Sequence, residues 1–323
     1  MTKREQPLVS ILINSYNYDR FIAEAIDSAL AQTYPHVEVI VVDDGSSDRS
    51  PEIIADYGDR ITAIYQSNQG QAAAFNRGFE ISQGDIICFL DADDIFHSQK
   101  AEILAKAWQE CPEAQWYLHP LTLFNQENQA TVVRHKAIAI EISQLRDVRK
   151  ALEAGKLGDP FDFPIPPTSG MCFTNQLAQK LLPMPLSGGI ILNDSYLKFA
   201  ALGISSGVAI DFPLAYQRIH DRNLFTTSKG NPDISLKRQQ TNTAIFLNTA
   251  YWLKAKFPTL TKFADSLFAV GVAMNWQLKA RSKGKNKALL QNKQIIQNYY
   301  RSSSPSSVVS IILKSCYKYL RQR

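Results

Sequence analysis

Long apolar runs are missing from this 323-residue sequence: none approaches the ~18 residues that a membrane-spanning helix needs. The first residues, Met1–Pro7, also lack the apolar core of a signal peptide. Cysteine is scarce, with four residues at spacings that match no metal-binding module. We therefore expect a cytoplasmic protein with reduced thiols, and we exclude an integral membrane protein and a disulfide scaffold.

Acidic residues are absent from Ser266 to the C-terminus, where eleven lysines and arginines stand. The rest of the chain holds 24 basic and 30 acidic residues, so an acidic body carries a basic tail. The last 18 residues mix aliphatic side chains with lysine and arginine, a pattern typical of an interfacial helix on an anionic membrane. A helical cap packed on the remainder of the chain explains the tail equally well. No nucleic-acid partner is expected, because no base-reading module is recognisable.

Strand and helix patterns alternate through the first hundred residues. Apolar, β-branched runs predict strands at 8–13, 37–42, 61–65 and 86–90, and amphipathic spacing predicts helices at 21–32, 51–57 and 71–82. The order strand, helix, strand, helix favours an α/β fold with a mainly parallel sheet and right-handed crossovers. The composition, 45% hydrophobic and 20% charged, is ordinary for such a domain.

Polar and acidic side chains follow three of these strands, at 14–17, at 43–48 and at Asp91, Asp93 and Asp94. The carboxyl ends of parallel strands meet at one edge of a sheet, where α/β proteins bind ligands. Carboxylates this close repel one another unless a cation or solvent intervenes. The acids at 91–94 fit either a solvated turn or a divalent-metal site for a phosphorylated ligand, and the convergence of three clusters favours the metal site. Residues 43–48 also fit an Asx-type turn.

Four segments together resemble the large inverting family 2 of the GT-A glycosyltransferases. They are Val9–Asn17, Val41–Asp48, Asn68–Gly78 and Gly84–Asp93. The resemblance implies the GT-A nucleotide-diphospho-sugar transferase fold, a mainly parallel central sheet flanked by helices. It is dense over 8–100 and looser to about 225. We therefore predict a catalytic domain at 1–225 and a basic helical C-terminal extension at 226–323.

The same resemblance assigns the donor-binding residues. It implies that the nucleotide and its diphosphate lie against Ser15, Tyr16, Asp43, Asp44, Gly70, Asn76 and Asp91. The chemistry agrees, because a carboxylate can accept the imide N–H of uracil and a tyrosine can pack against a base. We expect a UDP-sugar. Many members carry a basic residue where this chain has Phe75, so a charged contact from that helix is not expected.

The resemblance implies two protein ligands for one metal ion, the second acid of the D-x-D motif and a later histidine. Asp93 and His220 would ligate Mg²⁺ or Mn²⁺, hard cations that bind carboxylate and phosphate oxygens and stabilise a departing diphosphate. A lone histidine also fits a structural role. Arg218 and Arg222 are candidate phosphate contacts, and Asp94 is either a supporting acid or a helix cap.

The candidate general base is Asp194. The resemblance places an acid here, after a glycine-containing approach, where it would accept the proton of the acceptor hydroxyl. The sequence Asn193-Asp194 is equally a helix N-cap.

The second half is less regular. We predict helices at 101–111, 141–154 and 175–182, a strand at 115–124, and a proline-rich loop over the active site at 161–167. Residues 168–173 resemble the family's entry to the acceptor side. Three or four tail helices are expected, over the amphipathic segments 234–256, 260–280, 288–300 and 306–320.

These features predict a metal-dependent inverting glycosyltransferase that moves one hexosyl or N-acetylhexosaminyl group to a hydroxyl of a glycan or lipid-linked acceptor. Family members often build cell-surface polysaccharides or glycolipids, which would place the protein in the cytoplasm or at the inner face of the membrane. A processive synthase is disfavoured because no Gln-x-x-Arg-Trp motif is present. The alternatives are a non-catalytic sugar-nucleotide-binding or scaffold protein and a sugar-phosphate nucleotidyltransferase, whose glycine-rich N-terminal loop is missing.

Overall fold

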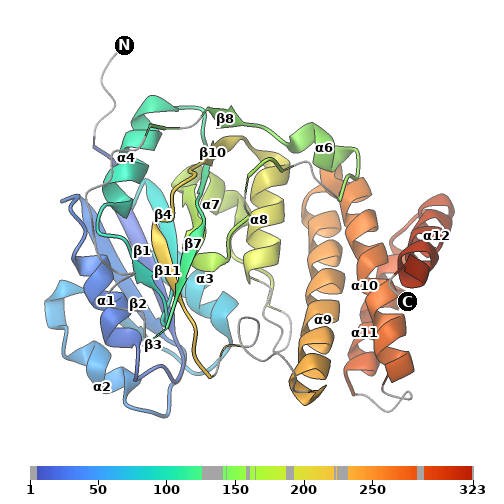
Figure 1. Cartoon of the computed structure of the whole chain (residues 1–323), viewed down its shortest axis with the longest axis horizontal. Coiled ribbons are helices and arrows are strands. Elements are labelled where there is room, and N and C mark those ends of the chain that lie inside the picture. Colours follow the sequence, from blue (N-terminus) through green and yellow to red (C-terminus); the bar gives the residue numbers. More distant parts are fainter. Residues whose placement is uncertain are drawn as a thin grey trace. The chain divides into compact units, whose positions relative to one another are not determined.

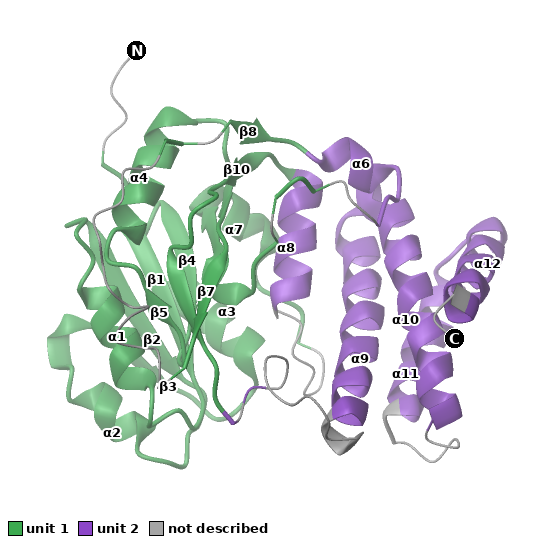
Figure 2. Cartoon of the chain, viewed as in Figure 1, with its two compact units in different colours: residues 1–147, 161–186, 205–220 green, residues 148–160, 187–204, 221–323 purple. Residues whose placement is uncertain are grey.

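The computed structural model describes residues 6–125, 141–142, 144–157, 161–163, 165–186, 193–221, 223, 232–281 and 287–321. The chain forms two compact units (Figure 2). The first contains residues 1–147, 161–186 and 205–220, and the second contains residues 148–160, 187–204 and 221–323. Residues 187–204 thus group with the C-terminal helices, whereas the division at 225 places them in the catalytic domain. That division stays a prediction.

An eight-stranded sheet with the order β3-β2-β1-β4-β9-β6-β10-β8 forms the centre of the first unit (Figure 1). The first four strands in this order are parallel: β1 (Val9–Ser15), β2 (Val37–Asp43), β3 (Thr62–Tyr65) and β4 (Ile86–Asp91). They are joined by α1 (Ile22–Leu30), α2 (Ser50–Ala55) and α3 (Gln71–Ile81). The apolar runs of β1 and β4 are buried, as expected for strands covered on both faces. The predicted α/β fold is confirmed.

The other half of the sheet is mixed. β9 (Met171–Thr174) runs antiparallel to both β4 and β6 (Trp116–Leu118). β10 (Gly207–Ala209) is parallel to β6 and antiparallel to the edge strand β8 (Leu145–Arg146). Helices α4 (Lys100–Glu110) and α7 (Asn175–Leu181) belong to the same unit.

A second, three-stranded sheet brings a distant segment to the acidic stretch. Its central strand β11 (Ala215–Arg218) lies between β5 (Ile95–Phe96) and β7 (Leu121–Phe124). β5 begins directly after Asp94, so pairing of β11 with β5 carries the residues after β11 to the D-x-D motif.

Two predicted elements are wrong. The single strand at 115–124 is two strands, β6 and β7, which enter different sheets on either side of His119 and Pro120. Proline cannot donate to a strand ladder, so the pairing pattern is interrupted there. The helix at 141–154 is helical only in α6 (Arg149–Glu153). The two residues of β8 pair with β10 instead, and tertiary pairing overrides the weak local helix preference.

The second unit is helical. Besides α6 it contains α8 (Asn193–Ile204), α9 (Pro232–Lys256), α10 (Thr261–Arg281), α11 (Lys287–Arg301) and α12 (Pro305–Arg321). Asp265 of α10 lies 3.1 Å from Lys254 Nζ and accepts a 2.8 Å hydrogen bond from Tyr299 Oη. The predicted tail helices are confirmed. Among the described residues, none of these helices has the length and apolar character required to cross a bilayer.

Candidate functional site

The carboxyl ends of β1 to β4 place polar side chains in a row at one edge of the large sheet. Asp43 on β2 lies opposite Tyr65 on β3 and opposite Ser15 on β1. Asn14, the residue before Ser15 on β1, lies opposite Asp91 on β4. Strand register therefore joins three of the predicted residues, Ser15, Asp43 and Asp91, on one rim.

Two buried polar atoms of β1 have no hydrogen-bond partner among the described residues. They are Ser15 Oγ and Asn14 Oδ1, and Ser15 is only 1% exposed. Buried polar groups are nearly always paired, so unpaired ones beside a row of carboxylates are candidates for ligand contacts.

Exposed aromatic rings stand beside Asp43. Tyr16 is 47% exposed and Tyr65 is 51% exposed. Burial raises the pKa of Tyr65, and the nearby charge of Asp43 raises it further. Tyr65 was not among the predicted donor-binding residues. Its position at the end of the third strand, just before a polar loop, could have indicated a ring that contacts the nucleotide base.

The Asx-type turn after β2 is present. Ser46 donates its backbone N–H to Asp43 Oδ1 over 2.9 Å and its hydroxyl to Asp43 Oδ2 over 2.6 Å. Gly45 has φ of +76°, and a side chain there would meet the backbone of Asn68. Each carboxylate oxygen can accept a second hydrogen bond, so the turn leaves Asp43 able to bind a ligand.

Asp44 holds the loop that leads into α3. Its carboxylate accepts hydrogen bonds from Gln66 Nε2, Gln69 N and Gly70 N at 2.7 to 2.9 Å. Gly70 precedes α3 with φ of +91°, a conformation that favours glycine. Asp44 and Gly70 are therefore in contact with each other, and together they fix the amino end of α3. A helix amino end presents unpaired N–H groups that favour anions.

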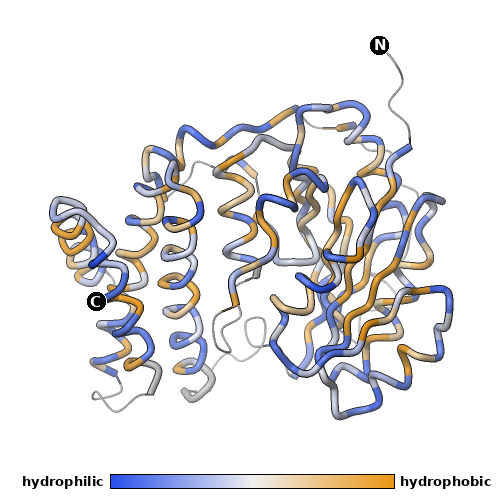
Figure 3. The backbone as a smooth tube through the Cα atoms, turned by 180° about the vertical axis from the view of Figure 1, so that it is seen from behind, coloured by the Kyte–Doolittle hydropathy of each residue, from blue (hydrophilic) through white to orange (hydrophobic). Residues whose placement is uncertain are grey.

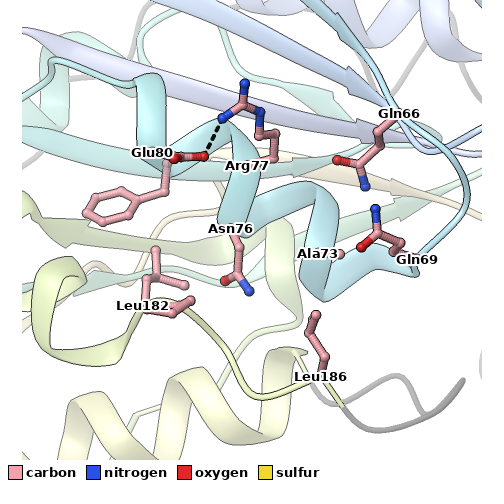
Figure 4. Close-up of a pocket in the computed structure, with 10 residues that line it drawn as sticks. Gln66, Gln69, Ala73, Asn76, Arg77, Glu80, Leu182 and Leu186 are labelled. Carbon is pink, nitrogen blue, oxygen red and sulfur yellow. Dashed lines mark hydrogen bonds and ion pairs between the residues drawn. The ribbon is translucent and has the colours of Figure 1, made fainter.

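Asn76 points away from the strand row. Its side chain donates to Met184 O over 2.9 Å and accepts from Met184 N over 2.6 Å, which ties α3 to the segment after α7. Between α3 and this segment lies a pocket of about 560 Å³ (Figure 4). The pocket lining includes Gln66, Gln69, Asn76, Arg77, Leu182 and Leu186, and none of Asp91, Asp93 or His220.

The two predicted metal ligands meet. His220 Nε2 lies 2.9 Å from Asp93 Oδ2, although the residues are 127 positions apart. The imidazole ring packs 4.8 Å from the ring of Phe21, which fixes its position. Asp91 accepts a hydrogen bond from the side chain of Gln71 at the start of α3. Within the part of the chain that the structure describes, no three His, Cys, Asp or Glu side chains gather as a metal site.

The donor set nevertheless fits a divalent cation, with the Asp93 carboxylate as the oxygen ligand that a hard cation prefers and the His220 imidazole as a nitrogen ligand. A carboxylate and an imidazole are both ligands of divalent metals, and two protein ligands leave positions for diphosphate oxygens.

Asp94 is an internal support. It is buried, and its Oδ2 accepts a 2.6 Å hydrogen bond from Ser169 Oγ, which also accepts the backbone N–H of Asp91 over 3.1 Å. Asp94 Oδ1 accepts the backbone N–H of Arg218 over 3.2 Å. Burial, and after it the charge of Asp93, raises the pKa of Asp94 well above its usual value. Ser169, in the short 3₁₀ turn Thr168–Gly170, is a residue that the sequence reasoning missed.

Arg218 is also internal, being 3% exposed. Its Nε donates to Asp93 O over 3.1 Å, and its Nη2 donates to Glu24 Oε2 over 3.0 Å. The guanidinium lies between the rings of Phe21 and Phe124, 4.8 and 4.5 Å from their centroids. Arg218 thus supports the acidic loop and does not form the exposed phosphate contact that we expected. Arg222 lies outside the described residues.

A fully buried lysine stands beneath Ser169. Lys100 Nζ donates to Ser169 O over 2.9 Å and lies 3.4 Å from the centroid of Phe96. Burial lowers the pKa of Lys100. Nothing in the local sequence distinguishes Lys100 from the other charged residues of α4, so this role could not be predicted.

Asp194 belongs to the second unit, in the first turn of α8. Its side chain is 34% exposed, and its Oδ2 lies 3.7 Å from Lys198 Nζ. Its Oδ1 accepts the backbone N–H of the next residue, Ser195, over 2.8 Å, whereas a helix N-cap accepts the N–H two or three residues further on. The assignment of Asp194 as the general base stays a prediction.

Comparison with known proteins bears on the family and the fold. Residues 10–152 match the family described as Glycosyl transferase family 2. An uncharacterized glycosyltransferase of Nostoc sp. strain PCC 7120 is 31% identical over 219 residues, which cover 67% of this chain. The alignment covers 66% of that relative's length, just under two thirds.

Solved structures share the fold. Staphylococcus aureus TarS 1–349 in complex with UDP-GlcNAc is 14% identical, with a TM-score of 0.52 over 92% of this chain and 93% of that chain. The mannosyltransferase PcManGT of Pyrobaculum calidifontis, in complex with GDP-Man and Mn²⁺, is 18% identical, with a TM-score of 0.50 over 99% and 89%. The match shows that residues 10–152 belong to glycosyltransferase family 2, and the solved structures show the GT-A fold.

Proposed function

We propose that the protein is a metal-dependent inverting glycosyltransferase that moves one sugar from a nucleoside-diphosphate donor, a UDP-sugar, to a hydroxyl. The observation that carries this proposal is the row of Ser15, Asp43 and Asp91 on neighbouring strands. The Asp93–His220 pair follows directly on the last of them. UDP-GlcNAc and GDP-Man in the two structures of the same fold support a nucleotide sugar as donor.

The donor's base and ribose would lie against the strand row. Tyr16 and Tyr65 offer exposed rings for the base, and Asp43 can accept an imide N–H. Ser15 Oγ has no other partner among the described residues. Asp91, oriented by Gln71, would accept a ribose hydroxyl.

The diphosphate would meet the amino end of α3 at Gly70. Asp44 and Asn76 act on the donor indirectly in this proposal. Asp44 fixes the loop before α3, and Asn76 fixes the segment around Met184.

Asp93 and His220 would hold Mg²⁺ or Mn²⁺. Such a cation, when bound, offsets the negative charge that develops on the departing diphosphate. The backbone of Asp93 is held by Arg218, and the ring of His220 by Phe21, so both ligands are positioned before any cation arrives.

Asp194 would take the proton from the acceptor hydroxyl as that oxygen attacks the anomeric carbon. The acceptor is a glycan or a lipid-linked saccharide used for a cell-surface polysaccharide or glycolipid. Such an acceptor implies a cytoplasmic enzyme that works at the inner face of the membrane.

Titration calorimetry with UDP, in the presence and absence of Mn²⁺, tests the proposal. Asp93→Ala should abolish the Mn²⁺-dependent part of binding, because one of the two protein ligands is lost. Asp59→Ala removes an exposed acid elsewhere in the same unit and should bind like the parent protein. Unchanged Mn²⁺-dependent binding by Asp93→Ala would exclude the metal assignment.

Turnover separates the proposal from its alternatives. A panel of nucleotide sugars should contain one that the protein hydrolyses slowly with Mn²⁺, releasing the nucleoside diphosphate. Binding without release from any donor or acceptor mixture would indicate a non-catalytic protein. Release of pyrophosphate from a nucleoside triphosphate and a sugar phosphate would indicate a nucleotidyltransferase.

A further inference from the structure

Helix α12 has one face packed within the second unit and another face exposed. Ile311 and Ser315 are fully buried, and Lys314 Nζ lies 2.9 Å from Ser266 Oγ on α10. These contacts fix the rotation of the helix about its axis, so the opposite side faces solvent.

That opposite side is apolar. Val309, Leu313, Cys316 and Leu320 follow one another at steps of four, three and four residues, which places them in a line along the helix. The exposed fractions are 58% for Val309, 65% for Leu313 and 68% for Leu320. Ile312 and Tyr317 flank the line at 41% and 56%. Figure 3 shows the hydrophobic colouring along this C-terminal helix.

A continuous exposed apolar row on a surface helix indicates a binding surface, because such a row is unfavourable in water. The charge around it selects the partner. The chain from Ser266 onward carries eleven basic residues and no acidic one. Two copies docked through α12 would bring like charges together, whereas an anionic partner would be attracted.

We infer that the exposed face of α12 (Val309, Ile312, Leu313, Cys316, Tyr317 and Leu320) docks the protein on an anionic lipid membrane. The aliphatic and tyrosine side chains enter the boundary between headgroups and acyl chains. The basic charge of the tail, which carries no acidic residue from Ser266 onward, attracts the protein to the anionic headgroups. The inference specifies the surface for the peripheral localisation proposed above, and it does not depend on the transfer reaction.

Co-sedimentation of the full chain with vesicles tests the inference. The protein should pellet with phosphatidylcholine vesicles that contain phosphatidylglycerol, and much less with phosphatidylcholine alone. The double variant Leu313→Ser/Leu320→Ser should lower the partition coefficient by at least about tenfold, because two large apolar side chains are no longer available for burial. Both leucines are exposed, so circular dichroism and the melting temperature should not change.

The matched control is Leu123→Ser, which removes a half-exposed leucine from β7 in the first unit and should pellet like the parent protein. Added salt should weaken binding to the anionic vesicles, because it screens the charge of the basic tail. Failure of the parent protein to pellet with anionic vesicles, or normal pelleting of the double variant, would overturn the inference. So would a lipid-free dimer that the double variant converts to monomer, since the face would then bind a second copy.

Calorimetry with UDP distinguishes a failure of the membrane inference from a failure of the proposed transferase function. The double variant should bind UDP and Mn²⁺ normally. A parent protein that binds vesicles but no nucleotide would contradict the transferase proposal and leave the membrane surface standing.

Discussion

Ser169, which lies in the segment predicted to enter the acceptor side, instead supports the acidic motif. Its hydroxyl oxygen is the link between the backbone of Asp91 and the carboxylate of Asp94, and its carbonyl oxygen receives the ammonium of Lys100. The two ends of the D-x-D-D stretch therefore share one buried partner. We regard Ser169 as a positioning residue, because it touches neither the expected ligand nor the metal.

Ser169→Ala should weaken Mn²⁺-dependent UDP binding and also destabilise the fold. Loss of a buried hydroxyl that makes two hydrogen bonds costs about 1–3 kcal/mol of unfolding free energy, measured by urea titration. Ser10→Ala is the matched control: its buried hydroxyl donates to Glu38 Oε1 and accepts from Gly84 N at the amino end of β1, whereas the acids lie at the carboxyl ends of the strands. Both variants should lose similar stability, but only Ser169→Ala should lose UDP affinity. Equal affinities in the two variants would contradict the positioning role.

The residues that were predicted from motifs stand at strand ends, whereas those that were missed depend on contacts between distant parts of the sequence. Asp43 and Asp91 end buried strands, so strand register alone brings them to one rim. Glu24 and Ser169 owe their roles to contacts with residues 194 and 75 positions away. No local pattern encodes such contacts, and only the family resemblance brought His220 into the predicted set.

Helix α3 contributes to the candidate site through three separate contacts. Its amino end is set by Asp44, its first residue orients Asp91, and its middle is tied to the segment after α7 through Asn76. Phe75, which stands where many family members have a basic residue, is buried against Phe89. Phe75 thus extends the apolar side of α3, and the diphosphate contact that we propose for this helix is at its amino end.

Asn76→Ala should loosen the segment around Met184. Two hydrogen bonds to the backbone of Met184 are lost, and we expect about 1–3 kcal/mol of destabilisation together with faster proteolytic cleavage near residues 182–186. The neighbouring Arg77→Ala removes only a surface ion pair with Glu80 and should cost less than about 1 kcal/mol. Equal cleavage rates in the two variants would show that Asn76 does not hold this segment.

Helices and strands were predicted correctly where apolar residues recur at the regular spacing of a helix or strand. They were predicted wrongly where a segment pairs with a strand far away in the sequence. The parallel strands and the tail helices match their apolar patterns closely. The charged stretch before α6 has helical spacing, yet Leu145 and Arg146 pair with β10 more than 60 residues later. The local preference of this segment for a helix is weaker than its pairing with β10, which offers backbone hydrogen-bond partners.

At the scale of the whole molecule, the candidate residues are divided between the two compact units. Donor and metal residues belong to the first unit, and the candidate base Asp194 belongs to the second. Donor binding and proton removal should therefore be separable by mutation.

Asp194→Asn should leave UDP binding intact and reduce sugar transfer by about 10²–10⁴-fold, as loss of a general base does. Lys198→Met is the control, because it removes the ion-pair partner of Asp194 but keeps the carboxylate, and it should retain most of the transfer rate. Rates are measured with the active donor and acceptor at saturation. Near-normal turnover in Asp194→Asn would assign the base to another residue, and an equal loss in both variants would indicate a role limited to helix stability.

The supports of the acidic loop also set an order of events during synthesis. Asp91 and Asp94 leave the ribosome 75 to 78 residues before Ser169, and Asp93 leaves 127 residues before His220. At translation rates of roughly 5–20 residues per second, the growing chain carries these carboxylates for about 4 to 25 seconds without those partners. A nascent chain that ends before β11 would therefore present an acidic loop without Arg218 and His220, and a premature stop before β11 would yield a fragment that keeps the strand row but lacks one of the two predicted metal ligands.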